Sequence, residues 1–219
     1  MKIENADMRG GLSFGKLLAA FTVGALVGTW YEEVLHFVVE GYYENRSGVV
    51  HGPFNPLYGI GYVLMLLALR PIRRPYAAVL IGAVLGGGFE YLANAAQEQL
   101  TGGVSWDYHD RLLNINGRTT LPYALFWGLL GFFMVHVVFP HLERAYEALP
   151  KRASSWTALG LSAFFLVNMT LSYTALLRQS ERREGLEPRT PYGEFLDRNY
   201  PCERLEAAFP DIVYEEAEE

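Results

Sequence analysis

The sequence contains a single cysteine, Cys202, in 219 residues, so a disulfide bond within the chain is excluded. It has no Cys or His pairs at zinc-binding spacing and no Gly-x-Ser-x-Gly or comparable nucleophile motif. Lys and Arg are outnumbered by Asp and Glu, 18 against 24, so the basic surplus typical of nucleic-acid-binding proteins is absent. We therefore expect neither zinc, nor another metal or cofactor, nor nucleic acid to bind.

Charge is also scarce over long windows and is concentrated at the C-terminal end. From Gln179 onward there are 12 acidic and 5 basic residues, whereas the first 178 residues contain 12 and 13. We expect two parts: residues 1–178, a polytopic membrane domain on the apolar runs described next, and residues 179–219, an acidic, proline-containing tail. The tail cannot bury a core of its own, but its aromatic residues could dock it onto the membrane domain as short helices.

The windows that lack charge are long apolar runs. A bilayer core about 30 Å thick requires roughly 20 apolar residues in a helix. Five segments come close to that length: Phe14–Val39, Leu57–Leu69, Tyr76–Ala96, Leu121–Phe139 and Trp156–Leu177. The second is short and would span only if residues before Leu57 contribute. A cleavable signal peptide is the alternative for the first, but two glutamates interrupt it and no cleavage site follows. The pattern predicts an all-α integral membrane protein with about five transmembrane helices.

Basic residues near the segment ends indicate the orientation. Nine fall on one predicted side: Lys2, Arg9, Lys16, Arg70, Arg73, Arg74, Arg144, Lys151 and Arg152. Three fall on the other: Arg46, Arg111 and Arg118. This bias predicts a multi-pass protein of the cytoplasmic membrane whose tail lies outside. Arg178, Arg182 and Arg183, at the start of the tail, argue for the opposite side.

Turn-forming residues precede the short second segment in "HGPFNPLYGIG", residues 51–61. Pro53 and Pro56 lack N–H groups and oppose helix, while glycine permits tight turns. Non-helical backbone survives at membrane depth only where protein or water shields it. We expect a re-entrant or interfacial loop packed against helices, with an ordinary external turn as the alternative.

Ionisable residues inside predicted spans are costly and usually functional. Glu32, Glu33 and His36 lie late in the first segment. Glu90, Asn94, Gln97 and Glu98 form a band along one face of the third. The Glu-x-x-His pair at residues 33–36 resembles half of a di-iron motif, but the second motif is missing, so no metal site is expected.

A third polar group is "WDYHDRLLNINGR", residues 106–118. Trp and Tyr suit a membrane interface. Asp107, Asn114, Asn116 and Arg118 are more than interfacial anchoring requires, so this loop is a candidate functional segment. By contrast, "GGLSFGK" at residues 10–16 has Leu17 where a phosphate-binding loop needs Ser or Thr, and no strand precedes it. We find no nucleotide-binding motif.

In combination these pieces resemble the ABC-transporter type IV family of bacterial membrane permeases. The resemblance covers roughly residues 14–175 and rests on five features in order: Glu32 or Glu33, Asn45–Arg46 before "GPFNPLYGIG", "EYLANAAQEQL", "WDYHDRLLNINGRTTL" and the pair Pro140–His141. It implies a five-span membrane protein that acts as a transporter permease. Such a permease would need a separate ATP-binding subunit. Because five helices are few for a pathway, a homodimer is also expected.

Three hypotheses remain open at this point. The first is a transport component, and the second is a membrane-embedded enzyme or lipid-binding protein in which Arg118 and Arg46 hold an anionic head group. In the third, the polar groups only pair with one another, Glu90 with Arg118 or Arg46. The candidate binding or pathway residues are Glu32, Arg46, Pro53, Tyr58, Glu90, Asn94, Glu98, Asp107, Asn114, Asn116 and Arg118.

Overall fold

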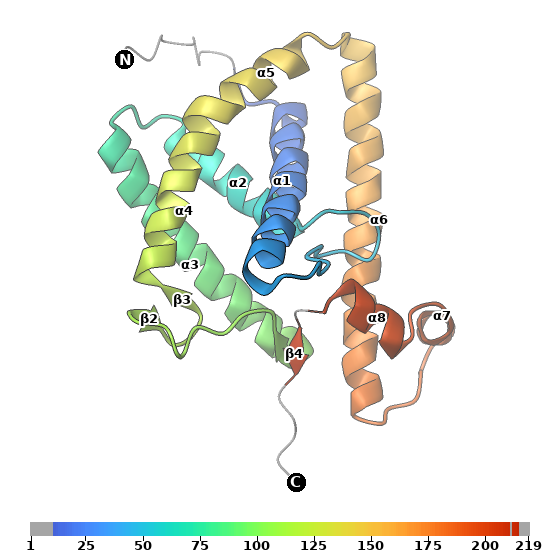
Figure 1. Ribbon diagram of the computed structural model, residues 1–219. Helices are drawn as coiled ribbons and strands as arrows, with labels where there is room; N and C mark the ends of the chain where they lie inside the picture. The colour runs from blue at the N-terminus through green and yellow to red at the C-terminus, as the bar shows by residue number, and fades with distance from the viewer. Residues whose placement is uncertain (1–10, 211, 215–219) are drawn as a thin grey trace.

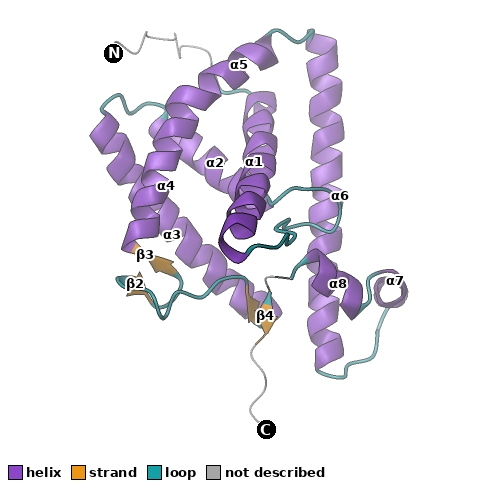
Figure 2. Cartoon of the chain, viewed as in Figure 1, coloured by secondary structure: helices purple, strands orange, loops and turns teal. Residues whose placement is uncertain are grey.

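The computed structural model describes residues 11–210 and 212–214, and the structural statements below concern these residues. The elements, in chain order, are α1 (Phe14–Glu40), α2 (Pro56–Leu69), α3 (Pro75–Thr101), β1 (Gly103–Val104), β2 (Asn114–Ile115), β3 (Thr119–Thr120), α4 (Leu121–Phe133), the π-helix η1 (Met134–Val138), α5 (Phe139–Glu147), α6 (Lys151–Arg183), α7 (Pro191–Asn199), α8 (Cys202–Ala208) and β4 (Val213–Tyr214). Strands in this part of the chain form only two short antiparallel pairs, β1–β4 and β2–β3, both at one end of the helices (Figure 2).

Four helical rods are long and apolar enough to cross a bilayer: α1, α3, the continuous α4–η1–α5 rod and α6. The 14-residue α2 is shorter. The prediction of an all-α membrane protein with about five transmembrane helices is confirmed in its class, with four helices long enough to span and α2 as a shorter fifth. Figure 1 shows that the α2–α3 turn, the α5–α6 turn and the start of α1 lie at one end of the molecule. The ends of α1 and α3, strands β2 and β3 and the C-terminal helices lie at the other.

The loop between α1 and α2, residues 41–55, turns back into the helical layer. The Asn55 N–H donates to the carbonyl oxygen of Ala25 (3.0 Å), 15 residues before the end of α1. At 1.5 Å per residue, α2 therefore begins about 22 Å along α1 from that end. Asn55 caps α2 by accepting the N–H of Leu57 (3.0 Å). The loop therefore returns alongside α1 before α2 begins, which brings the short second segment into the helical layer.

Helix α6 shields this re-entrant loop on its other side. The Asn168 amide accepts the N–H of His51 (3.2 Å) and donates to its carbonyl oxygen (2.6 Å). The hydroxyl of Ser172 accepts the N–H of Val50 (2.9 Å). Because these side chains are buried, the loop backbone at Val50 and His51 is hydrogen-bonded to protein. Non-helical backbone at membrane depth would require such partners.

The fourth predicted span ends at Phe139, but the helix continues to Glu147. Pro140 has no N–H to donate, and the preceding turn widens into η1, where the Phe139 N–H donates to the carbonyl oxygen of Met134. The buried cluster of Ala20, Tyr62, Met65, Leu66, Leu69, Val135 and Phe139 packs around this segment. An apolar core therefore fills the half of the bundle that includes the α2–α3 turn.

Ion pairs hold the same end together. The Lys16 ammonium contacts the carboxylates of Glu143 (2.7 Å) and Glu147 (2.6 Å), and Arg70 lies 3.5 Å from Glu143. Of the other basic residues expected on this side, Arg73 and Arg74 lie between α2 and α3, Arg144 lies in α5, and Lys151 and Arg152 begin α6. Lys2 and Arg9 lie outside the described residues.

The chain after Gln179 docks on α6. Helix α6 runs through the expected boundary at residue 178 to Arg183, and α7 and α8 pack against it through Ala175, Leu196, Tyr200, Leu205 and Phe209. Asp197 accepts hydrogen bonds from Arg178 (2.9 and 3.0 Å) and from Arg182 (2.6 Å). Arg183 contacts Glu206 (3.2 Å). The arginines that opposed an outside tail are therefore neutralised by the tail itself.

Candidate functional site

A buried polar group, here called the intramembrane cluster, joins four helices through Glu32 of α1, Tyr58 of α2, Glu90 of α3 and Trp127 of α4, together with Tyr108 and Thr119 from the segment between α3 and α4. Its central member is Glu90, which is 7% exposed. The Glu90 carboxylate accepts hydrogen bonds from the hydroxyls of Thr119 (2.6 Å) and Tyr108 (3.2 Å). The Trp127 indole also contacts it. Both hydroxyl donors are neutral, so within the described residues Glu90 is solvated by hydroxyl groups rather than paired with a cation.

Glu32 joins the cluster through Tyr58. The Tyr58 hydroxyl meets the Glu32 carboxylate and lies within electrostatic range of Glu90 and Tyr108. The sequence makes room for this arrangement at Gly28, where a Cβ atom would lie 2.2 Å from the Tyr58 ring. The glycine in α1 therefore lets the tyrosine of α2 approach close to the helix backbone.

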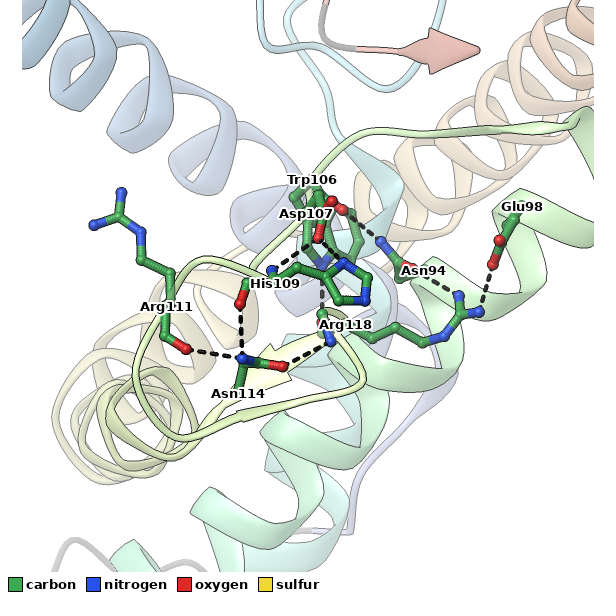
Figure 3. A network of polar contacts seen from close by, with 9 residues as sticks. Asn94, Glu98, Trp106, Asp107, His109, Arg111, Asn114 and Arg118 are labelled. Carbon is green, nitrogen blue, oxygen red and sulfur yellow. Dashed lines mark hydrogen bonds and ion pairs between the residues drawn. The ribbon is translucent and has the colours of Figure 1, made fainter. Parts of the chain in front are cut away.

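The polar stripe of α3 continues from Glu90 toward the end of the helix. The Asn94 side chain, 3% exposed, donates to the carbonyl oxygen of Trp106 (2.7 Å) and accepts from Arg118 (2.8 Å). Arg118 also forms an ion pair with Glu98, one turn further along (Figure 3). The predicted face of α3 thus contacts the predicted functional loop, one residue per turn.

The loop itself is shaped by asparagine. The Asn114 amide donates to the carbonyl oxygens of His109 (3.0 Å) and Arg111 (2.8 Å) and accepts the N–H of Gly117 (3.0 Å), as Figure 3 shows. The bond to Gly117 closes the turn between β2 and β3, and the other two fix the segment that precedes β2. Leu113 and Asn116 have positive φ values of 59° and 52°, a conformation that costs a leucine about 1–2 kcal/mol. Local backbone strain of this kind is typical of functional segments.

Two loop residues have shifted pKa values. The backbone N–H of His109 and then its ring hold the pKa of the Asp107 carboxyl below its usual range. Burial, followed by the charge of Glu90, raises the pKa of the Tyr108 hydroxyl above its usual range. At neutral pH, Asp107 is therefore an anion and Tyr108 a neutral hydrogen-bond donor.

A cavity of about 90 Å³ lies between the end of α3 and this loop. We call it the loop cavity. Its lining includes Asn94, Glu98, Asp107, His109, Asn116 and Arg118. The cavity therefore brings together most of the residues of α3 and of the loop that the sequence predicted as candidate binding or pathway residues.

Other nominated residues lie elsewhere. Arg46 forms an ion pair with Glu44 (2.6 Å) and donates to His36 (2.7 Å), and Pro53 is exposed on the re-entrant loop. The pairing of Glu90 with Arg118 or Arg46, which was the third hypothesis, is wrong, because Arg118 pairs with Glu98 and Arg46 with Glu44. Because both guanidinium groups are already paired with carboxylates, neither arginine is free to bind an anionic head group.

The cluster includes residues that the sequence did not nominate. Tyr108 and Thr119 stand inside a motif that was recognised, but their contact with Glu90 depends on the fold of the loop. Trp127 lies in an apolar helix, and nothing in the sequence distinguishes it from a lipid-facing residue.

The stretch that mimics a phosphate-binding loop has structural roles. Ser13 caps α1 by accepting the N–H of Lys16 (3.4 Å), and the Lys16 ammonium is held by two glutamates of α5. Gly10 lies outside the described residues. The lysine is thus already paired with carboxylates.

Comparison with known families gave one match, covering residues 19–173, to the family described as "Putative ABC-transporter type IV". Neither the comparison with curated proteins nor the comparison with solved structures gave a significant match. The match and the apolar helices together are those of a membrane protein related to transporters.

Proposed function

Since the chain belongs to the ABC-transporter type IV family, we propose that it is the membrane-spanning permease component of a transporter of the cytoplasmic membrane. In this proposal the chain crosses the membrane five times, with the re-entrant loop and α2 as one crossing. It has no ATP-binding site of its own and works with a separate ATP-binding subunit and a second copy of itself.

The observation that carries the proposal is the polar route along α3. Glu98 and Asn94, one turn apart on α3, line the loop cavity, and Glu90, one turn further along the same helix, belongs with Glu32 to the intramembrane cluster. Beyond them the apolar cluster around Leu66 fills the bundle. A hydrophilic entrance on one side that meets an apolar seal on the other is what a pathway closed toward one compartment requires.

Two observations support the separate ATP-binding subunit. The stretch most similar to a phosphate-binding loop is used to cap α1 and to bind α5. At the same end, Arg73 and Arg74 are exposed in the α2–α3 turn, where a partner could contact them. The head-group alternative has less support, because the arginines it needs are neutralised by glutamates.

The test is purification of the tagged chain from its native membrane in a mild detergent, followed by native mass spectrometry. We expect a complex with two copies of the chain and a stoichiometric ATP-binding subunit. Arg73→Ala with Arg74→Ala should release that subunit, whereas Arg111→Ala, at the opposite end, should not. A homo-oligomer that carries one enriched lipid and no ATP-binding subunit would contradict the proposal.

The proposed orientation can be tested with the native cysteine. Cys202 begins α8 and is partly exposed. If the tail lies on the outer side of the cytoplasmic membrane, Cys202 should react with a membrane-impermeant maleimide in intact cells. As a control, Arg73→Cys in a Cys202→Ser background should be labelled only after the cells are permeabilised. Labelling of Cys202 that requires permeabilisation would reverse the orientation.

A further inference from the structure

The loop cavity has an excess of negative charge and of hydrogen-bond acceptors. Glu98 and Asp107 contribute two carboxylates to its lining, against one arginine, Arg118. The arginine is already engaged, because its two terminal amino groups bind the Asn94 oxygen (2.8 Å) and the Glu98 carboxylate. The cavity therefore offers an incoming ligand little positive charge.

Several oxygens of the lining remain open among the residues that the structure describes. Asp107 uses Oδ1 to accept both N–H groups of His109 (2.9 and 2.5 Å), and its Oδ2 has no hydrogen-bond partner there. Glu98 binds Arg118 through Oε2 only. Asn116 donates its amide N–H to Tyr91 (3.0 Å), which leaves its carbonyl oxygen free. These groups can accept hydrogen bonds but cannot donate them.

We propose that the loop cavity binds a small ammonium-bearing solute, a primary amine with only a few non-hydrogen atoms. This inference rests on the proposed function, for which it names the substrate class. An ammonium group brings one positive charge and three N–H donors, which match the open oxygens of Asp107 and Glu98. The Trp106 ring in the lining adds an aromatic surface that favours cations. A volume of about 90 Å³ admits a short alkylamine but not a drug-sized ligand.

The state of Asp107 supports this assignment at physiological pH. Its pKa lies below the usual range because the carboxylate accepts the His109 N–H groups. The carboxylate therefore remains charged across the neutral range and below it.

The experiment measures binding to the full-length chain, purified in detergent, by isothermal titration calorimetry. The probes are ethylammonium chloride and, as an anion of similar size, sodium acetate. We expect saturable binding of ethylammonium and none of acetate. Asp107→Asn should weaken ethylammonium binding tenfold or more, since it removes the charge but keeps the oxygen that accepts the His109 backbone N–H.

Asp110→Asn is the matched control. It removes the same charge from the same loop, but Asp110 is exposed and does not line the cavity. Its effect on ethylammonium affinity should stay within twofold. An equal loss in both variants, tighter binding of acetate, or the lack of saturable ethylammonium binding would each overturn the inference.

This readout is independent of the proposed function. Ethylammonium binding without a co-purified ATP-binding subunit would support the site and reject the ATP-driven permease. A stoichiometric ATP-binding subunit without ethylammonium binding would support the permease and reject this substrate class.

Discussion

Replacing Gly128 with alanine should destabilise the bundle through a clash that no side chain can relieve. Helices α3 and α4 meet backbone to backbone here, because a Cβ atom on Gly128 would lie 2.2 Å from the carbonyl oxygen of Val79 and 2.8 Å from the backbone N of Ala83. Small residues permit such approaches between membrane helices. Because the obstructing atoms belong to the backbone, the two helices must separate. Overpacking of this kind costs about 3 kcal/mol.

For a chain of this length, such a loss lowers the melting temperature by roughly 6–12 °C, at about 2–4 °C per kcal/mol. The assay is thermal unfolding in detergent, followed by tryptophan fluorescence. Gly88→Ala is the matched control in α3, since a Cβ atom there meets none of the described atoms within 4 Å. Alanine's higher helix propensity should leave that variant unchanged or slightly stabilised. Equal shifts in both variants would refute the reasoning.

Three further predictions concern the intramembrane cluster, the tail and the loop. Glu90→Ala leaves the buried Thr119 hydroxyl without its acceptor and should lower the free energy of unfolding by about 1–3 kcal/mol in the same melting assay. Glu90→Gln should fold normally and lose transport. Equal melting temperatures for the two variants would contradict this prediction. Arg178 holds the pKa of the Asp197 carboxyl below its usual range. The Asp197 carboxylate therefore stabilises tail docking fully above about pH 4, the pKa of an aspartate in the unfolded chain. This stabilisation is lost as the pH falls through the lower pKa of the folded state. Proteolysis of the segment between α6 and α7 should therefore start only under acid conditions, and cleavage that does not change with pH would count against the pair. Leu113→Gly should raise stability by about 1 kcal/mol because glycine relieves the positive φ, and a lower melting temperature would contradict this.

The membrane helices could be predicted from the sequence because hydrophobic length and the scarcity of charge dominate in a bilayer. The segment Trp156–Leu177 lies wholly within α6, which extends it at both ends, to Lys151 and Arg183. Those extra turns carry charged residues, which hydropathy excludes from a span. Tail acids neutralise the last of them, so their helical state depends on tertiary contacts.

The re-entrant loop was predictable in kind but not in depth. The sequence predicts non-helical backbone here because of Pro53, Pro56 and the neighbouring glycines. The depth depends on Asn168 and Ser172, more than a hundred residues away in sequence, which satisfy that backbone. Neither residue is distinguishable in sequence from a polar residue tolerated in a long helix.

In the candidate site, too, the positions of the polar residues could be predicted from the sequence, but their partners could not. The spacing of Glu90, Asn94 and Glu98 placed them on one helix face, and the structure brings this face against the loop of residues 106–118. The choice of partner was not predictable, because arginine and glutamate pair wherever the backbone permits. Here Glu98, not Glu90, is within reach of Arg118. Glu90 instead accepts hydrogen bonds from the neutral donors Thr119 and Tyr108.

The tail connects two segments at the polar end of the bundle, the re-entrant loop and the segment that contains β1. Tyr200 contacts His51 of the re-entrant loop (3.2 Å), and the Asn45 amide donates to the carbonyl oxygen of Ala208 (2.8 Å). Strand β4 pairs with β1, whose residues Gly103 and Val104 line the loop cavity. The family match ends at residue 173, before these contacts begin. In this chain, therefore, any widening of the cavity that moves β1 away from α6 must first break contacts made by a segment outside the matched region.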